Sequence, residues 1–224
     1  MFKFKGISSN NMRVIVEEEE HFIARARQRY EITEIEGKDD AIFNEQGYSY
    51  IERPILIQCL DVNKIDDILS WLDGSGELEY KGRKTMARFY AELEPERRTS
   101  IRVIDTNFIR APFWYKADDE FVNTSNEVIN EGTIISRPII RIEKTNSNYI
   151  ELAIGSVRFT YNFENDDWVE IDCEEKTIKY NGIDRNRQII IGYEFPKLQP
   201  GKNNVFLHSG EAIIKMKRKD RWLW

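Results

Sequence analysis

The sequence predicts a nearly all-β chain with one short helix, arranged as two domains. Most segments alternate apolar and polar side chains with a period of two and are rich in Val, Ile, Tyr, Phe and Thr, which is the pattern of strands with one buried face. Short stretches rich in Gly, Asn, Asp and Pro separate these segments and indicate turns. A polar stretch without periodicity near the middle of the chain indicates the division into two domains.

Residues 1–117 are expected to form the first domain, which is β-sandwich-like. Its expected strands are residues 12–16, 21–35, 50–59, 88–93 and 101–109, and a further strand closes on residues 111–115. Alternation along residues 22–35 places Arg25, Arg27 and Arg29 on one face, so that strand has an unusual charged side. The Gly and Asp content of residues 36–40 predicts a turn, and the next extended stretch begins at residue 48.

The expected helix covers residues 63–72. Its apolar side chains recur at helical spacing and make a single stripe: Ile65, Ile68, Leu69 and Leu72. Asp61 is a candidate N-cap, although Asn63 offers a competing start. Gly74 or Gly76 can supply the left-handed residue that ends the helix. Because the stripe needs an apolar surface to cover, the helix should lie against the sheet.

Residues 118–133 are expected to be a linker, and residues 134–224 a second domain. The expected strands of this domain are residues 139–142, 150–154, 157–163, 168–173, 177–180, 205–208 and 212–216. Short strands at this spacing, separated by turns such as Asn181-Gly182, predict a sandwich or a jelly roll.

Composition limits the classes of function. The formal net charge of −6 argues against sequence-independent binding of nucleic acid, which depends on Lys and Arg neutralising phosphates. Cys59 and Cys173 fall in different expected domains, so we expect two buried, reduced thiols and not a bridge. No apolar run approaches the length of a membrane span. These features predict a soluble product made in a cytoplasm, with no membrane partner.

Few residues suggest chemistry, and no catalytic, cofactor or metal site is expected. With His21 and His208 as its two histidines, the sequence excludes a histidine-rich metal site. The glutamates at 17–20 beside His21 could be read as cation ligands, but alternate residues of an extended run diverge. Gly74-Ser75-Gly76 is too short for the nucleophile elbow of a serine hydrolase and follows a helix where the elbow follows a strand.

Two further features allow alternatives. An acidic cluster near Trp168 could suggest paired glycosidase carboxylates: Asp166, Asp167, Glu170, Asp172, Glu174 and Glu175. A dense local run is more often an exposed turn, so a non-catalytic sugar site, where surface Trp and Tyr stack on sugar rings, is the stronger alternative. The basic and aromatic tail at 215–224 could contact nucleic acid, but it also fits a strand with one wet side and tryptophans that anchor the chain end or a neighbouring subunit.

Motifs in both halves resemble one family. In the first half, a helix leaves through Ser-Trp-Leu-Asp-Gly-Ser-Gly-Glu-Leu and a strand closes on Ala-Pro-Phe-Trp-Tyr. The residues of this signature are Trp71, Leu72, Gly74, Gly76, Leu78, Pro112, Phe113 and Tyr115. Four motifs follow in order in the second half. They are an Asn-x-Gly and Ser-x-Pro-Ile-Ile-x-Ile pattern, an Ile-Asp-x-Glu strand end, a Phe-Pro-x-Leu-x-Pro-Gly-x-Asn turn and an Arg-Trp ending. The residues of this second set are Asn130, Gly132, Pro138, Asp172, Pro196, Gly201 and Asn203. The chain resembles the distal tail proteins of long-tailed, non-contractile bacteriophages and their prophage relatives.

The resemblance implies a structural protein of the virion tail and not an enzyme. It implies a first domain that forms a hexameric ring continuing the tail tube, and a galectin-like second domain that projects outward. The ring would contact the tube protein on one side and the tail-tip or tail-associated lysin protein on the other, and would be the hub of the host-adhesion device. A carbohydrate-binding module for host-surface glycans is the alternative function.

Two hypotheses concern the ring that the resemblance implies. We expect the strand 22–35 and a partner strand near residues 48–59 to line the channel or the seam between subunits. The observation behind this is the charged face formed by Arg25, Arg27 and Arg29. The net negative charge of the ring is expected to keep DNA from binding as it passes through.

Overall fold

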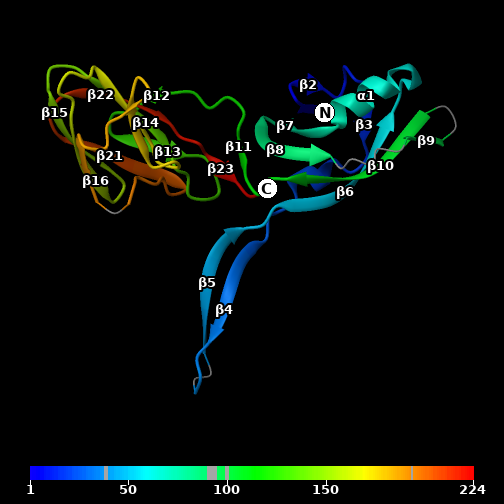
Figure 1. Cartoon of the computed structure of the whole chain (residues 1–224), viewed down its shortest axis with the longest axis horizontal. Helices are drawn as coiled ribbons and strands as arrows, with labels where there is room; N and C mark the ends of the chain where they lie inside the picture. The colour runs from blue at the N-terminus through cyan, green and yellow to red at the C-terminus, as the bar shows by residue number, and fades with distance from the viewer. Residues whose placement is uncertain (38–39, 90–94, 99–100, 193) are drawn as a thin grey trace. The chain divides into compact units, whose positions relative to one another are not determined.

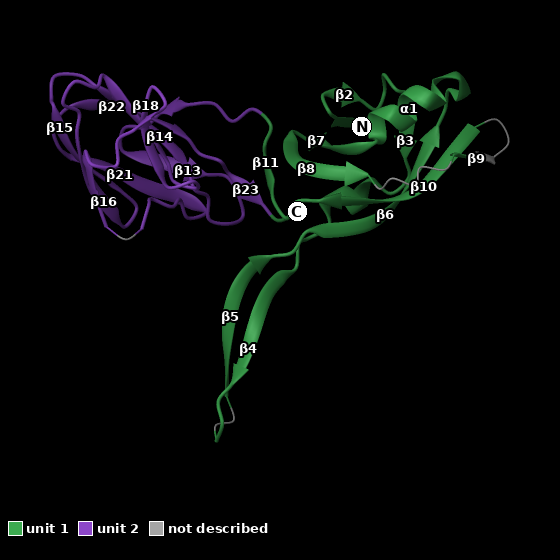
Figure 2. Cartoon of the chain, in the orientation of Figure 1, with its two compact units in different colours: residues 1–117, 223–224 green, residues 118–222 purple. Residues whose placement is uncertain are grey.

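The computed structural model describes residues 1–37, 40–89, 95–98, 101–192 and 194–224 (Figure 1). The chain forms two compact units (Figure 2). Unit 1 consists of residues 1–117 and 223–224, and unit 2 of residues 118–222. The prediction of a nearly all-β chain with one short α-helix is confirmed.

Unit 1 is built on one antiparallel sheet with the strand order β2-β1-β7-β8-β10-β6-β3, in which β9 also pairs with β10 and β11 with β8. A separate two-stranded sheet contains β4 and β5. The elements are β1 (Phe2–Phe4), β2 (Ile7–Ser8), β3 (Val14–Val16), the 3-10 helix η1 (Glu19–Ile23), β4 (Gln28–Glu34), β5 (Ala41–Tyr48), β6 (Ile51–Cys59), the 3-10 helix η2 (Val62–Lys64), α1 (Ile65–Leu72), β7 (Gly74–Tyr80), β8 (Arg83–Phe89), β9 (Pro95–Arg98), β10 (Ile101–Arg110) and β11 (Trp114–Lys116).

Aromatic rings fill the core of unit 1. Phe22 lies with its ring centroid 5.2 Å from those of Phe2 and Phe108. Phe89 meets Phe4 edge-on at 5.0 Å. Each of these rings is at most 2% exposed, and edge-to-face contacts of this kind add to the burial of apolar area. The rings come from three strands (β1, β8 and β10) and η1, so the core connects the N-terminal segment to the middle of the sheet.

Helix α1 matches the expected helix. Asp61 is the N-cap of η2, which leads directly into α1: its Oδ1 accepts a hydrogen bond from the backbone N–H of Asn63 at 3.1 Å. The N-cap of α1 itself is Lys64, whose side chain makes no capping hydrogen bond. Ile68 and Leu72 are fully buried against the unit, as the apolar stripe requires. Gly74 follows the last helical turn with φ of +79°, the left-handed conformation that glycine adopts at low cost.

Unit 2 contains a six-stranded sheet with the order β12-β22-β14-β17-β18-β19 and a five-stranded sheet with the order β13-β21-β15-β16-β20. Alternating residues of both sheets enclose one apolar core, which includes Ile140, Leu152, Phe159, Val169 and Val205. The strands are β12 (Val122–Asn123), β13 (Glu127–Asn130), β14 (Ile139–Lys144), β15 (Tyr149–Ile154), β16 (Val157–Asn162), β17 (Trp168–Asp172), β18 (Thr177–Tyr180), β19 (Ile183–Asp184), β20 (Ile189–Ile191), β21 (Gly201–Ser209), β22 (Ala212–Lys217) and β23 (Arg221–Trp222).

The expected linker at 118–133 is not a linker. It contains β12, which pairs with β22, and β13, which pairs with β21, so the segment completes both sheets of unit 2. Val128 and Asn130 are buried there. The sequence conceals this because a short edge strand with one buried face carries few apolar residues.

The expected strand at 21–35 is also different. Its first residues form η1, and β4 begins at Gln28. Its partner is β5, which the sequence analysis did not recognise, whereas β6 pairs with β10 and β3. The expected strand at 88–93 is the end of β8, which starts at Arg83 and pairs with the unrecognised strand β7; residues 90–93 lie outside the described part of the chain.

Three findings concern residues of possible chemical interest. Cys59 and Cys173 are free and buried. No helix in the described part of the chain is long and apolar enough to span a membrane. Among the described residues, no group of three or more His, Cys, Asp or Glu side chains could hold a metal ion.

Candidate functional site: the hairpin arm and its root

Strands β4 and β5 leave the sheet of unit 1 as an extended hairpin, here called the arm (Figure 1). The two strands pair antiparallel, from Gln28 opposite Tyr48 at the root to Glu34 opposite Ala41 near the tip, with an irregularity between Gln28 and Tyr30. No other described strand pairs with them. A two-stranded hairpin is at best marginally stable alone in water, so the arm needs a surface to pack on.

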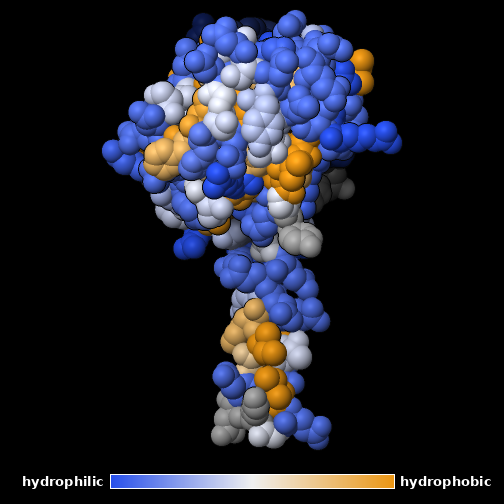
Figure 3. All heavy atoms as spheres, turned by 90° about the vertical axis from the view of Figure 1, so that its left-hand side faces the viewer, coloured by the Kyte–Doolittle hydropathy of each residue, from blue (hydrophilic) through white to orange (hydrophobic). Residues whose placement is uncertain are grey.

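One face of the arm carries an exposed apolar patch, with Glu34 and Glu45 at its borders. Ile32 lies opposite Phe43 in the strand register, and Tyr30 lies two residues away on the same face. Their exposed fractions are 52%, 62% and 49%. The rings of Tyr30 and Phe43 meet edge-on at 5.8 Å, which makes the three side chains one patch. Figure 3 shows hydrophobic side chains exposed on the arm.

The opposite face of the arm is mainly polar. Glu31 lies opposite Asn44, and its carboxylate accepts a hydrogen bond from Gln46 Nε2 at 3.1 Å. Thr33 lies opposite Ile42, the apolar exception on this face, which is 50% exposed. The arm is therefore amphipathic without a core of its own beneath its apolar face.

Arg110 fixes the root of the arm. This side chain, at the end of β10, is fully buried. Its Nε donates to the carbonyl of Phe22 at 2.8 Å, its Nη2 to the carbonyl of Ala24, and its Nη1 to the carbonyls of Ala111 and Pro112 at 2.7 and 3.3 Å. Burial lowers the pKa of Arg110 to about 10, so the group stays cationic at neutral pH. One guanidinium thus joins the segment that enters the arm to the segment that follows β10.

The predicted Ala-Pro-Phe-Trp-Tyr signature completes this root. Phe113 meets Tyr48, the last residue of β5, edge-on at 5.4 Å, and its carbonyl accepts a hydrogen bond from Thr85 Oγ1 at 2.8 Å. Pro112 supplies one of the carbonyls that Arg110 binds. Tyr115 lies in β11 opposite Lys84 of β8. The signature therefore holds the base of the arm against the sheet.

Arg25, Arg27 and Arg29 are all exposed near this root. Arg25 and Arg27 precede β4, and Arg29 lies within it. The Arg25 guanidinium lies 5.4 Å from the ring centroid of Trp224, and Arg29 Nη2 donates to the carbonyl of Gln46 at 3.1 Å. The structure places the three side chains along one segment, as expected, although two of them are outside the strand.

The helix signature has a structural role in the core. Trp71 Nε1 donates to the carbonyl of Phe4 at 2.8 Å, which attaches α1 to β1. Leu72 and Leu78 are fully buried. At Gly76 a Cβ would lie 2.4 Å from Lys5 Cγ, so only glycine lets β7 and the N-terminal segment approach this closely.

The second set of motif residues closes turns in unit 2. Asn130 Nδ2 donates to the carbonyls of Ile134 and Leu198 at 3.0 Å, and its Oδ1 accepts from the N–H of Gly132 at 2.8 Å. A Cβ at Gly132 would lie 2.3 Å from the carbonyl oxygen of Arg221. The Asn-x-Gly motif is therefore required by a close approach of two backbone segments.

Asn203 has the same role in the Pro-Gly-x-Asn turn. Its Nδ2 donates to the carbonyls of Gln199 and Gly201, and its Oδ1 accepts from the N–H of Gln199 at 2.8 Å. Gly201 adopts φ of +87° at the start of β21. Pro138 and Pro196 are buried beside these strands. These motif residues therefore stabilise turns and strand ends.

Residues 131–222 match the family model of the siphovirus-type tail component, C-terminal domain. Unit 2 is a siphovirus-type tail component domain. The predicted resemblance to the distal tail family is thereby confirmed, and the match supports a structural component of a phage tail.

Solved structures give the fold of the whole tail component. The crystal structure of SPP1 Dit, described as a paradigm of the hub adsorption apparatus in phages that infect Gram-positive bacteria, matches 96% of this chain and 97% of its own at 14% identity, with a TM-score of 0.69. Two structures of the activated phage p2 baseplate, with Sr and with Ca, match 95% of this chain and 92% of theirs, at 9% and 10% identity and TM-scores of 0.40 and 0.42. No curated protein sequence matches the chain.

The acidic cluster of this tail component does not form a glycosidase pair. Asp166 is buried and receives two hydrogen bonds from Arg185, at 2.8 and 3.1 Å. Asp172 caps a turn, because its Oδ1 accepts from the N–H groups of Glu174 and Glu175 at 2.9 and 3.0 Å. The carboxylate of Glu174 pairs with Arg137 at 2.8 Å. These three carboxylates are engaged in holding the fold.

Trp168 is not an open stacking platform for a sugar. The Arg141 guanidinium lies 4.2 Å from its ring centroid, and Tyr180 meets the ring edge-on at 5.2 Å. The glutamates before His21 also have other partners: Glu19 accepts from the N-terminal ammonium at 2.6 Å and from Tyr80 Oη at 2.9 Å.

The basic tail is built into the tail component domain. Lys215 pairs with Glu143 at 2.8 Å, Lys219 with Asp172 at 3.3 Å and Arg218 with Asp220 at 3.0 Å. Trp222 is buried, at 8% exposed, as the anchoring interpretation of the tryptophans requires. Ion pairs within the unit occupy the side chains that a phosphate backbone would need.

Strand β5 and the role of Arg110 could not be predicted from the sequence. The apolar residues of β5 occupy only its first positions, so alternation is too short to identify a strand. Arg110 looks like a solvated charge at a strand end, and no local pattern distinguishes it from one. The Arg25, Arg27 and Arg29 pattern was the signal that pointed to this region.

Proposed function

We propose that the chain is the distal hub of a phage tail: six copies form a closed ring that continues the tail tube and carries the tail-tip or tail-associated lysin protein. The observation that carries the proposal is the arm. A hairpin with an exposed apolar face and no core beneath it is suited to packing on another subunit, and the same contact repeated around an axis closes a ring.

The free edges of the unit 1 sheet add support. The strand order begins at β2 and ends at β3, and both strands are very short. Ile15 of β3 is 49% exposed. Short edge strands that carry an exposed apolar side chain are available to a neighbouring chain, while their length limits uncontrolled pairing.

The proposed hub is not an enzyme and lets DNA pass without binding it. Three carboxylates of the acidic cluster, those of Asp166, Asp172 and Glu174, are held in turns and ion pairs. The net charge of −6 per subunit favours repulsion between the ring and DNA. A channel surface that proves strongly positive in a structure of the ring would contradict this part of the proposal.

The arm is tested by replacing its apolar face. We expect the double variant Ile32→Ser with Phe43→Ser to remain folded but to shift the protein from a ring to a monomer, measured by size-exclusion chromatography with light scattering. The reason is that both side chains are exposed in the single chain and would be buried only in the assembly.

The matched control is Thr33→Ser with Asn44→Ser, which changes the polar face of the same strands. The control is expected to assemble as the unchanged chain does. A ring that survives loss of the apolar face, or loss of the ring in both variants, would overturn the role of the arm.

A further inference from the structure

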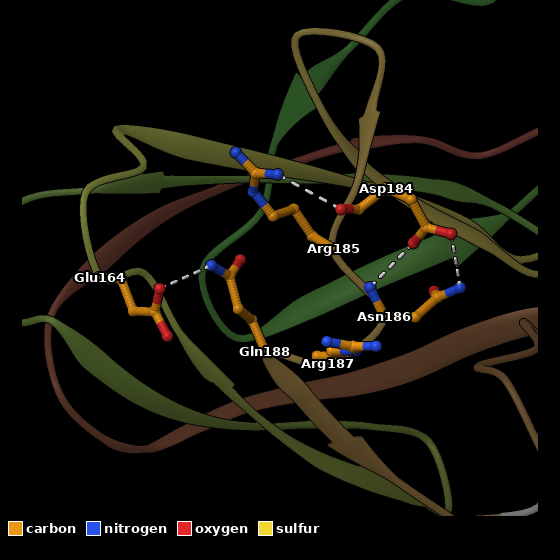
Figure 4. Close-up of a pocket in the computed structure, with 6 residues that line it drawn as sticks. All are labelled: Glu164, Asp184, Arg185, Asn186, Arg187 and Gln188. Carbon is orange, nitrogen blue, oxygen red and sulfur yellow. Dashed lines mark hydrogen bonds between the residues drawn. The ribbon is translucent and has the colours of Figure 1, made fainter.

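Unit 2 contains a cavity of about 550 Å³. It is lined by Glu164, Asp184, Arg185, Asn186, Arg187 and Gln188. Figure 4 shows Glu164 on one side, Asp184 and Asn186 on the other, and Arg187 and Gln188 between them. The lining comes from the turn after β16, the end of β19 and the loop between β19 and β20. The volume lies within the range of small-molecule sites.

A buried hydrogen-bond network lies behind this cavity. Arg185 donates from Nε to Asp166 Oδ2 at 2.8 Å and from Nη2 to Asp166 Oδ1 at 3.1 Å, and Asp166 is only 4% exposed. The Tyr161 hydroxyl lies 3.0 Å from Asp166 Oδ2 and 2.8 Å from Gln188 Oε1. Burial, together with Asp166, raises the pKa of Tyr161, so the hydroxyl keeps its proton. The network fixes the back of the cavity.

Hydrogen bonds along the rim fix the remaining lining. Gln188 Nε2 donates to Glu164 Oε2 at 3.1 Å. Asp184 accepts from the backbone N–H of Asn186 at 2.9 Å and from its Nδ2 at 3.1 Å. Because its loop is already ordered, a ligand would not have to immobilise it, which lowers the entropy cost of binding.

Three polar groups remain open toward the cavity. Among the described residues, none forms a hydrogen bond or ion pair with the Arg187 guanidinium, and none donates to Glu164 Oε1 or to Asn186 Oδ1. Arg187 offers several donors, while the two oxygens are acceptors. The open groups thus combine donors and acceptors. Because Arg185 is paired with Asp166, the charged groups that remain in the lining are the Arg187 guanidinium and the carboxylates of Glu164 and Asp184.

We propose that this cavity binds one residue of a neutral saccharide. Each sugar hydroxyl is both a donor and an acceptor, so a ring of hydroxyls can bond to a guanidinium and to carboxylate and amide oxygens at once. An anionic ligand would meet Glu164 and Asp184, and a metal ion would meet Arg187. Arg185 and Asp166 are positioning residues, because their polar atoms bond to each other.

The proposal goes beyond the hub function and does not depend on it. The lining belongs to one chain, so a monomer would bind as well as a ring. In a ring, six weak sites would act together on a polymeric glycan, and avidity would exceed the affinity of one site.

The test is an NMR titration of the full-length, ¹⁵N-labelled chain with glucose, galactose, N-acetylglucosamine and rhamnose, each added separately. At least one sugar should shift the amide signals of residues 184–188 in a saturable manner. Arg187→Ala and Glu164→Gln should each weaken that binding about tenfold, because each removes a hydrogen bond to a charged group. Both residues are exposed, so these variants should fold.

Lys202→Ala is the control, since Lys202 is exposed in unit 2 and does not line the cavity. Its affinity should equal that of the unchanged chain. The proposal is overturned if no sugar shifts these amides, if the shifts persist in Arg187→Ala and Glu164→Gln, or if only inorganic phosphate or Ca²⁺ produces them. Failure of the ring experiment would leave this result unaffected.

Discussion

Buried polar side chains hold the turns that the sequence motifs mark. Asn130 and Asn203 each satisfy backbone groups at three points, and the cost of leaving such groups unpaired explains why a short, two-sided amide occupies both positions. Turns that contain Asn and Gly can be predicted from a sequence, because few other residues can replace them there. The role of Arg110 could not be predicted, because its carbonyl partners come from segments far apart in the chain.

Asp172 gives a residue-scale prediction about pH. Burial alone would raise the pKa of Asp172, but the N–H groups of Glu175 and Glu174 and the ammonium of Lys219 lower it below its ordinary value. A carboxylate with a lowered pKa in the folded chain stabilises it fully above the ordinary pKa and loses that contribution as pH falls through the folded-state value. Asp172→Asn should therefore cost roughly 1 kcal/mol at pH 7, and the difference should shrink below about pH 4.

Thermal unfolding measured by circular dichroism from pH 7 to pH 2.5 checks this prediction. Asp167→Asn is the control, because Asp167 is exposed and its carboxylate has no partner among the described residues. Its difference from the unchanged chain should stay near zero throughout. If the loss of stability in Asp172→Asn does not change with pH, the charge of the Asp172 carboxylate does not contribute, and the prediction is contradicted.

At the scale of elements, the amphipathic pattern predicted most strands, and it failed for β5, whose side chains are mostly exposed. Strand β5 buries neither face within the chain, so its sequence does not show the regular alternation of a half-buried strand. The strands β12 and β13 were missed for a different reason. They are two and four residues long, too short for a period to be read.

The attachment of the arm gives the element-scale prediction. Arg110→Lys keeps the charge but cannot reach carbonyls on both sides of the root, so buried carbonyls lose their donor. We expect a loss of about 3 kcal/mol in the free energy of unfolding. Hydrogen exchange by mass spectrometry should show faster exchange in residues 24–34 and 41–48.

Arg53→Lys provides the comparison, since Arg53 is an exposed arginine on the neighbouring strand β6. It should leave both stability and exchange unchanged. Equal exchange in the arm of Arg110→Lys and of the unchanged chain would mean that Phe113 and Tyr48 hold the root without the guanidinium.

For the whole molecule, composition and motif order were more informative than any single residue. Two β units and a tail component domain follow from patterns that many residues share, so individual errors did not alter them. The assembly is different, because a ring depends on complementary surfaces of separate copies. The side chains that point to it, the arm patch and the arginines near its root, are recognisable only once the fold shows them to be exposed.

Reversal of charge at Arg25, Arg27 and Arg29 tests the assembly at this scale. If these exposed side chains lie at the seam between subunits, three glutamates there should repel the surface that now attracts the arginines, and the ring should dissociate to monomers in size-exclusion chromatography with light scattering. The control is a triple variant that changes the net charge by the same amount at exposed positions of unit 2: Lys176→Glu, Lys179→Glu and Lys202→Glu. This control should assemble normally. The two variants have the same net charge. If only the arginine variant dissociates, the position of the charges, and not the net charge, causes the dissociation. If both variants form intact rings, the three arginines do not lie at the seam between subunits.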